Sequence, residues 1–379
     1  MPKCHLYFPE NDLALAANLD NYTPPRQAQV MHRDGATLPL WYGHPGDVFI
    51  ATGINGQWYE TMAKAFNLQV DLYSGDASAY IPAPWGWSRA ARRALEHAGF
   101  NSRQLPDDAA IEHIRDLSHR RVARDIALAL TDNLDFPITI PAIEAHTIDE
   151  AIAAIRSLGQ VIIKTPWSNA GRGIIPADSS SSDTLTQRLT PIISRYGSVM
   201  VEKRHQRIMD FAMLFDSTSD GVKYIGLSVF DTDDNGAYTG NIVANDEILK
   251  SFITRYLPSE HLDQISCLLT NILSSRLTGQ YEGPLGVDML VARHGDTFIL
   301  DPAVELNLRM TMGHVAHRLA IDTLAHGHTA RFSITPNTKP HCDFNNPTTG
   351  ISITNHMLTS GSLRLNPPSC PTSITLTTL

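Results

Sequence analysis

The chain has 379 residues, which corresponds to two or three domains and suffices to bury a core without disulfides or metals. Its formal charge is −9, and charged residues make up 18% against 42% hydrophobic ones, which excludes a disordered, highly charged chain. No basic surplus exists to neutralise phosphates, so the composition argues against a general nucleic-acid binder. We expect small-molecule partners and no nucleic acid.

The sequence predicts a cytoplasmic protein that has no contact with membranes. Residues 1–20 lack the continuous apolar stretch and the small-residue cleavage site of a signal peptide. No run of 18 uncharged apolar residues is present, so no membrane span is expected. The cysteines are scattered without a Cys-x-x-Cys pair, which is typical of a reducing compartment.

The first 115 residues are predicted to form an N-terminal α/β domain. The expected elements are strands at 47–52 and 69–73 and helices at 57–66 and 89–98. Ser88 is the expected N-cap of the last helix, and Gly99 would end it. Alternating strands and helices imply a mostly parallel sheet, and such sheets bind ligands at the carboxyl ends of their strands.

Two segments of this domain are candidate substrate contacts. They are Glu10, Asn11 and Asp12, which follow a predicted first strand at 5–8, and Trp85 and Trp87 on either side of Gly86. Polar groups just past a parallel strand lie where ligands bind, and paired tryptophans can form an aromatic wall. Alternatively, Asn11 or Asp12 caps a helix at 13–17, and the tryptophans anchor the packing of domains.

Helices and strands alternate less regularly in the rest of the chain. The expected helices are a long region at 107–130, one at 148–158 after the capping box of Thr147, one at 260–276 and one at 311–324. Strands are expected to dominate between 159 and 242. After residue 350 only Arg364 is charged, and 351–354 and 373–376 alternate as strands do. The end of the chain is therefore predicted to be strand-rich or, alternatively, partly disordered.

Residues 160–173 combine a strand, a lysine and a loop of small residues. The β-branched strand ends in Lys164, and Gly171 and Gly173 let backbone amides approach phosphate oxygens closely. The segment is not a Walker loop, because the lysine precedes the loop. The alternative is a plain glycine-containing hairpin. The next strand ends in Glu202 and Lys203 and can present backbone groups to an adenine edge, although acidic residues end many strands.

A third group of polar residues lies on a predicted β-hairpin with its turn at His294-Gly295. Pairing about this turn places Asp288 near Asp301. If the chain stays extended beyond the hairpin, one face carries Asp301, Glu305, Asn307 and Arg309. Carboxylate and amide oxygens of this kind suit Mg²⁺. The alternative is a surface hairpin with solvated acids.

Taken in order, these elements resemble the ATP-grasp superfamily over about residues 115–325. The matching residues are Arg120 or Arg121 opening a helix, Lys164, the loop 168–173, Glu202 and Lys203 with Asp210, and Asp288, Glu305 and Asn307. Residues 305–309 read Glu-x-Asn-x-Arg, as in carboxylase-type members. Two departures are the Ser118-His119 segment before the first basic residue, and Asp301 at the hairpin position where the family places its Glu-x-Asn.

The resemblance implies an α/β fold with an α+β ATP-grasp body at 116–330, divided at about 205. A pre-ATP-grasp-like domain at 1–115 would precede this body, and a tail at 331–379 would follow it. The implied activity is that of an ATP- and Mg²⁺-dependent ligase that activates a carboxylate as an acyl phosphate for attack by an amine or thiol. A small-molecule kinase and a non-catalytic nucleotide-binding protein are the alternatives, and a homodimer is left open.

The resemblance also implies roles for individual residues. The metal ligands would be Asp288, Glu305 and Asn307, with Asp301 in reserve. The nucleotide contacts would be Arg120, Lys164, Ser168, Asn169, Gly171, Gly173, Glu202, Lys203 and Asp210. The catalytic residues would be Lys164, which would hold the phosphates, Arg172, which would close over the nucleotide, and Arg309, which would stabilise the transferring phosphoryl group or the acyl phosphate. His314 and His317, on the expected helix at 311–324, are alternatively zinc ligands, and His314 alone would be a substrate contact.

Overall fold

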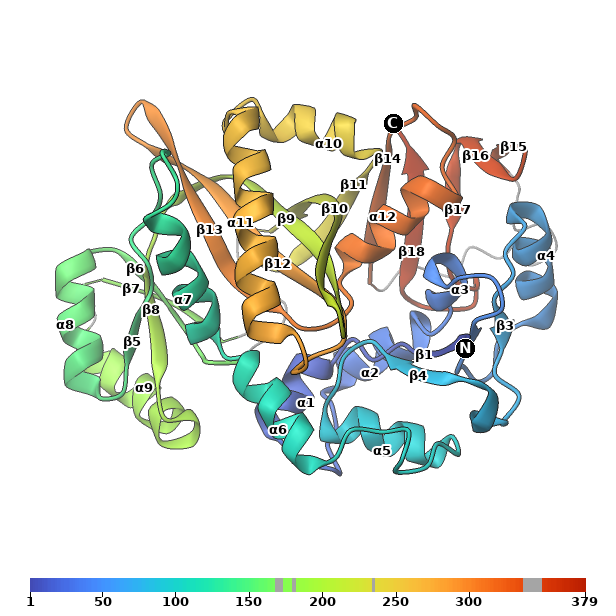
Figure 1. The fold of residues 1–379 in the computed structure, drawn as a ribbon, viewed down its shortest axis with the longest axis horizontal. Helices are drawn as coiled ribbons and strands as arrows, with labels where there is room; N and C mark the ends of the chain where they lie inside the picture. The colour runs from blue at the N-terminus through green and yellow to red at the C-terminus, as the bar shows by residue number, and fades with distance from the viewer. Residues whose placement is uncertain (168–172, 179–181, 234–235, 337–349) are drawn as a thin grey trace.

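The computed structural model describes residues 1–167, 173–178, 182–233, 236–336 and 350–379. It confirms the predicted α/β class, because it combines a parallel sheet, a small antiparallel sheet and a large antiparallel sheet with helices packed on them. Figure 1 shows the small sheet at one end of the molecule, the large sheet in the centre and the N-terminal elements below and beside it. Among the described helices, none is long and apolar enough to cross a bilayer.

The N-terminal elements form the predicted parallel sheet. They are β1 (Lys3–Leu6), α1 (Asn11–Ala17), α2 (Arg26–Asp34), α3 (Pro39–Tyr42), β2 (Val48–Phe49), α4 (Gly56–Phe66), β3 (Asp71–Leu72), a 3₁₀ turn (Ala77–Ala79), β4 (Ile81–Pro84) and α5 (Arg89–His97). The strand order is β3-β2-β1-β4, and every pair is parallel. Ser88 caps α5 as predicted, because its hydroxyl accepts a hydrogen bond from the amide of Ala91. Tyr7, Phe8 and Pro9 follow β1 and lead to Glu10 and Asn11, beyond the carboxyl end of that strand.

The small antiparallel sheet carries the predicted lysine strand. The elements from residue 108 to 203 are α6 (Asp108–Leu117), α7 (Arg120–Thr131), β5 (Ile143–Ala145), α8 (Ile148–Leu158), β6 (Val161–Lys164), β7 (Ile174–Ala177), α9 (Ser182–Tyr196) and β8 (Val199–Lys203). The strand order is β5-β8-β6-β7, and α8 and α9 pack on the sheet. We expected strands in place of α9, but the buried Leu185 and Leu189 follow helical spacing.

The predicted helical region at 107–130 is two helices. The chain breaks between α6 and α7 at Ser118 and His119, and the side chain of His119 accepts a hydrogen bond from the amide of Arg121 at 3.0 Å. His119 therefore acts as the N-cap of α7 and fixes where that helix begins.

The large antiparallel sheet forms the centre of the molecule. Its strands and helices are β9 (Gln206–Thr218), β10 (Gly221–Thr232), β11 (Tyr238–Val243), α10 (Asp246–Ile253), α11 (Ser259–Leu277), β12 (Gly283–His294), β13 (Thr297–Asn307), α12 (Met312–Asp322) and β14 (Ala330–Thr335). Leu227 and Val229 of β10 belong to the core that α7 and α11 cover. Gly226 and Ser228 alternate with them and contact α12, which covers the opposite face.

The C-terminal segment completes the large sheet. Its strands are β15 (Ser352–Thr354), β16 (Met357–Ser360), β17 (Ser362–Arg364) and β18 (Ser373–Thr378). The strands predicted at 351–354 and 373–376 are confirmed, and β18 pairs with β14 over six residues. Leu365 also accepts a hydrogen bond from the indole of Trp41 at 2.7 Å, and one core joins both segments. The segment therefore connects the large sheet to the N-terminal domain.

Candidate functional site

Arg309 forms an ion pair between the central sheet and the N-terminal segment. It follows β13 directly, and its guanidinium holds both carboxylate oxygens of Asp12 at 2.7 to 2.9 Å. The same guanidinium donates to Oδ1 of Asn307 at 2.7 Å. Burial alone would lower the pKa of Arg309, but Asp12 at this distance raises it, so the side chain stays cationic.

The three predicted metal ligands lie on two paired strands. Asp288 on β12 is the direct cross-strand partner of Glu305 on β13, and Nδ2 of Asn307 donates to Oδ2 of Asp288 at 3.0 Å. Burial, followed by repulsion from Glu305, raises the pKa of Asp288 to about 7. The structure therefore gathers two mutually repelling carboxylates and one amide in a small space.

The expected pairing of Asp288 with Asp301 is wrong. Asp301 pairs with Leu290, and a bulge in β13 separates it from Glu305. At this bulge Met289 alone lies opposite residues 302–304, so β13 carries two extra residues. The residue opposite Asp288 is therefore Glu305 and not Asp301.

Helix α7 supplies the first basic residue of the site. Arg120 lies buried at the first turn of α7 and forms an ion pair with Glu305 at 2.9 Å. Its backbone amide donates to the carbonyl of Pro166 at 3.1 Å, two residues beyond Lys164. Arg121 instead points outward, with a side chain that is 42% exposed. Of the two basic candidates, Arg120 is the one that reaches the carboxylates. We call Asp12, Arg309, Asn307, Asp288, Glu305 and Arg120 the Arg309 network.

Lys164 lies at the end of β6 and faces acidic residues of both sheets. Its ammonium forms an ion pair with Glu202 of β8 at 2.5 Å. Burial, followed by repulsion from Glu202, raises the pKa of Asp301 to about 6, and the charge of Lys164 opposes that rise. A backbone hydrogen bond of 2.8 Å from Thr139 to Leu300 brings the linker before the small sheet against β13. Lys164, Glu202 and Asp301 therefore form a second charged group between the two sheets.

The remaining predicted nucleotide contacts lie on different elements, and several of them fall outside the described residues. Asp210 of β9 forms an ion pair with Arg207 and accepts a hydrogen bond from Thr232 at 3.1 Å. Lys203 ends β8 directly after Glu202. Gly173 has a φ of 76°, which favours glycine, at the start of β7. The predicted residues Ser168, Asn169, Gly171 and Arg172 lie outside the described residues.

The residues around Asp288 fit a magnesium ion. Two carboxylates and one amide oxygen are hard ligands, and Mg²⁺ is usually bound by one or two carboxylates together with substrate phosphates and water. A bound cation would also relieve the repulsion between Asp288 and Glu305. Among the described residues, no group of three or more His, Cys, Asp or Glu has the arrangement of a metal site, so no histidine-rich zinc centre is found there. His314 instead closes a capping box with Thr311 at the start of α12.

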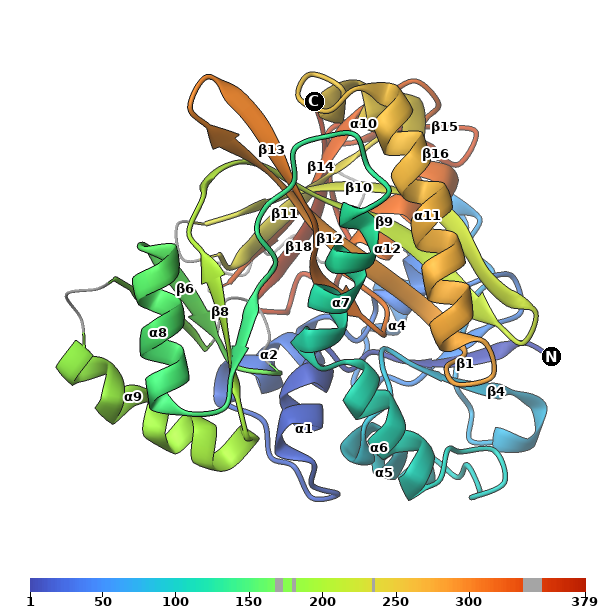
Figure 2. The same cartoon turned by 60° about the vertical axis from the view of Figure 1, so that its left-hand side comes forward.

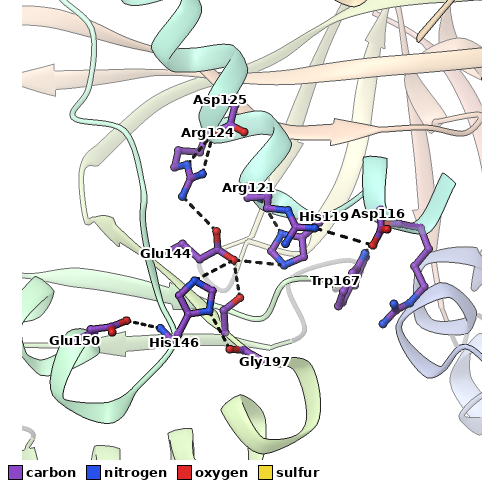
Figure 3. Close-up of polar contacts among 12 residues, drawn as sticks. Asp116, His119, Arg121, Arg124, Asp125, Glu144, His146, Glu150, Trp167 and Gly197 are labelled. Atoms are coloured by element: carbon purple, nitrogen blue, oxygen red, sulfur yellow. Dashed lines mark hydrogen bonds and ion pairs between the residues drawn. The ribbon is translucent and has the colours of Figure 1, made fainter. Parts of the chain in front are cut away.

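A buried polar cluster that the sequence did not predict holds α7 against the small sheet (Figure 3). Glu144 of β5 lies at its centre, with one carboxylate oxygen 2.9 Å from the hydroxyl of Ser198 and the other 3.3 Å from Arg124. His119 lies 3.8 Å from the same carboxylate, and its ring packs edge-on against Trp167. The cluster thus fixes the helix that carries Arg120 and the segment that follows Lys164.

Three local signals could have revealed this cluster. The signals are a glutamate within a short apolar strand, a histidine directly before a basic helix start, and a tryptophan shortly after Lys164. They come together only because β5 and β8 are neighbours in the small sheet. The spacing of residues along the chain does not reveal that β5 and β8 pair.

The stability of the protein is expected to fall in acid because of His119. Burial, followed by the charge of Arg121, lowers the pKa of His119 to about 4. Between the unfolded value of about 6.5 and 4 the unfolded chain binds the extra proton, so stability declines as pH falls through this range. The expected contribution is on the order of 1–3 kcal/mol.

The measurement compares the pH dependence of the melting temperature in wild type and in His119→Asn, which keeps an N-cap acceptor. The variant should lose less stability than wild type between pH 6.5 and 4. His146→Asn is the matched control, because that side chain is 60% exposed in the same cluster. Parallel profiles for wild type and His119→Asn would contradict the expectation.

The charged residues of the site follow one another along the chain in the predicted order. A basic residue opens α7, a lysine ends β6, a glutamate ends the neighbouring strand β8, and Asp288 faces Glu305 on the closing hairpin. This is the order that the resemblance implied. Figure 2 shows the small sheet beside the large sheet, with α7 between them.

Several solved structures resemble this chain at low sequence identity. No protein-family model matches the sequence, and no curated protein matches it significantly. Similar solved structures include N5-carboxyaminoimidazole ribonucleotide synthetase in its ADP complex (TM-score 0.49, 12% identity, 100% of this chain and 92% of that chain), biotin carboxylase from Campylobacter jejuni (0.49, 14%, 90% and 77%) and L-amino acid ligase from Bacillus licheniformis (0.47, 11%, 100% and 93%). At these values none of them determines what this chain binds or converts.

Proposed function

We propose that this protein is an ATP- and Mg²⁺-dependent ligase that activates a small-molecule carboxylate as an acyl phosphate, which an amine then attacks. The observation that supports this proposal is the Arg309 network. It links a pair of repelling carboxylates suited to Mg²⁺ with a cation at the carboxyl end of the N-terminal sheet, where ligands bind in parallel sheets. One end of the network suits a nucleotide, and the other suits a second substrate.

The proposed roles follow from charge and position. Lys164, Arg120 and the backbone near Gly171 and Gly173 would neutralise and hold the phosphates of ATP, while Arg172 would close over them. Glu202 and Lys203 would contact the adenine and Asp210 the ribose. Lys164 is held in place by Glu202, and Arg120 by Glu305 and Pro166. Such fixed charges need no reorganisation when the phosphoryl group moves.

Magnesium would be held by Asp288, Glu305 and Asn307, and when bound it would neutralise charge on the phosphate oxygens. Arg309 would orient the carboxylate and stabilise the acyl phosphate, because Asp12 fixes its guanidinium beside Asn307. The reaction needs no enzyme nucleophile, since positioning and charge stabilisation carry it.

The proposal extends to location and domain organisation. It places the protein in the cytoplasm, in keeping with the scattered cysteines. It divides the chain into an N-terminal domain at 1–115, a body at 116–330 and a tail at 331–379. A small sheet at one end of the body and a large sheet at its centre support two subdomains.

The experiment that tests the function is an ADP-release assay with Mg²⁺-ATP and pooled carboxylates and amines. A ligase should need both kinds of co-substrate, and hydroxylamine should replace the amine by trapping the acyl phosphate as a hydroxamate. Release that needs one co-substrate and yields no hydroxamate would indicate a kinase. No release from protein that binds Mg²⁺-ATP would indicate a non-catalytic nucleotide-binding protein.

A further inference from the structure

The segment after β1 holds polar atoms that are buried and have no hydrogen-bond partner among the described residues. They are the hydroxyl of Tyr7, Oε2 of Glu10, and both Oδ1 and Nδ2 of Asn11. Glu10 is 2% exposed and Asn11 is fully buried. Buried polar groups are nearly always paired, because an unpaired one costs about 1–3 kcal/mol. Three such residues within one short segment indicate a place where something else supplies the partners.

These atoms lie beside the Arg309 network. Asp12, the next residue, holds the guanidinium of Arg309. A Cβ placed on Gly86 would lie 2.5 Å from Nδ2 of Asn11 and 2.8 Å from Cβ of Arg309, so both side chains press on the same glycine. The unpaired atoms are therefore adjacent to the residue that would stabilise the acyl phosphate, on the side of the N-terminal domain.

The charges at this position favour a cationic ligand. Arg309 compensates Asp12, whereas the described partner of Glu10 is His32, whose Nδ1 lies 2.8 Å from Oε1. No described residue donates a hydrogen bond to the second oxygen of Glu10. The side chain of His32 on α2 is 32% exposed, whereas that of Glu10 is 2% exposed. An ammonium group would give Oε2 a donor and a charge partner.

We infer that Glu10 and Asn11 form the subsite for the amine co-substrate, in which Glu10 binds the ammonium group and Asn11 bonds a neighbouring polar group of the same molecule. This inference rests on the proposed function and adds the class of the second substrate and the residues that select it. It also explains why an asparagine with no protein partner for its side chain is kept fully buried.

Ligand-observed NMR on the full chain tests the inference without needing turnover. The probe is a pool of common amino acids and simple alkylamines, and the comparison pool holds their N-acetyl derivatives, which lack the ammonium group. Wild type should bind at least one free amine and not its acetylated form. Glu10→Gln should weaken that binding at least about tenfold, because a charge-assisted hydrogen bond contributes more than 1.4 kcal/mol.

Two controls separate recognition from folding. Glu60→Gln replaces an exposed carboxylate of the same domain on α4 and should leave amine binding unchanged. The melting temperature of Glu10→Gln should stay within about 3 °C of wild type, a shift of less than about 1 kcal/mol. If Glu10→Gln unfolds, Asn11→Ser serves as the second variant and should weaken the binding of the same amine.

The inference is overturned if wild type binds no amine, or if it binds acetylated and free amines equally well. It is also overturned if both variants bind the amine as tightly as wild type does. Stabilisation by Mg²⁺-ATP, measured on the same samples, distinguishes the two proposals. Stabilisation by the nucleotide without amine binding removes the inference and keeps the proposed function. Amine binding through Glu10 without any response to the nucleotide removes the ligase reading and leaves an amine site.

Discussion

Glu305→Gln is expected to lower ATP turnover about 100-fold or more. The substitution keeps the shape of the side chain but removes one of the two carboxylates that face each other across β12 and β13. It also removes the charge that holds Arg120 at 2.9 Å. Both the metal and the first basic contact would then be misplaced. The measurement is steady-state ADP release at several Mg²⁺ concentrations, where the variant should need more metal.

Asp296→Asn is the matched control, because Asp296 is an exposed acid at the turn of the same hairpin. It should keep wild-type turnover and metal dependence. Undiminished turnover in Glu305→Gln would contradict the assigned role and transfer it to Asp301. In that case Asp301→Asn should lower ATP turnover about 100-fold or more, as expected for Glu305→Gln.

Lys164→Met is expected to abolish the stabilisation of the protein by Mg²⁺-ATP. Lys164 is a buried cation at the end of the strand that precedes the predicted phosphate loop, and methionine keeps the length of the side chain without the charge. The substitution leaves Glu202 without its partner and removes the charge that opposes the raised pKa of Asp301. The free protein should therefore lose about 1–3 kcal/mol as well. The measurement is the melting temperature with and without Mg²⁺-ATP.

A double variant separates nucleotide binding from stability. Lys164→Met with Glu202→Gln removes both charges of the pair, so the free protein should recover much of its stability while the response to Mg²⁺-ATP stays absent. Lys250→Met removes a half-buried cation that pairs with Asp263 and lies on α10, a helix that carries no residue of the site, so this variant should behave as wild type. A full nucleotide response in Lys164→Met would show that the phosphates bind elsewhere.

Much of the fold was predictable because it depends on local periodicity. Helix α11 and the cap of α5 follow from spacing and from one serine, and Lys164 ends its strand as predicted. Helix α9 was missed because Pro191 and a serine-rich start mask its apolar positions. Local sequence predicts whether such a segment is a helix or a strand only when its polar and apolar residues follow the same periodicity.

The site was predictable in its residue types and less so in its contacts. The motif from Glu305 to Arg309 identifies oxygen ligands and a cation, but no spacing announces that Arg309 pairs with Asp12, 297 residues earlier. The partner of Asp288 depended on a bulge, and a bulge has no reliable signature in one sequence. Tertiary contacts of this kind come from how sheets meet, which local patterns do not encode.

The bulge of β13 makes the site sensitive to changes of chain length. The two extra residues at 302–304 are an even number, so Asp301, Glu305 and Asn307 keep the same side of an alternating strand. Deleting one residue there would turn Glu305 and Asn307 away together, although neither is altered, whereas deleting two would keep their side. Among natural relatives, single-residue insertions or deletions between Asp301 and Glu305 should therefore be absent from active enzymes.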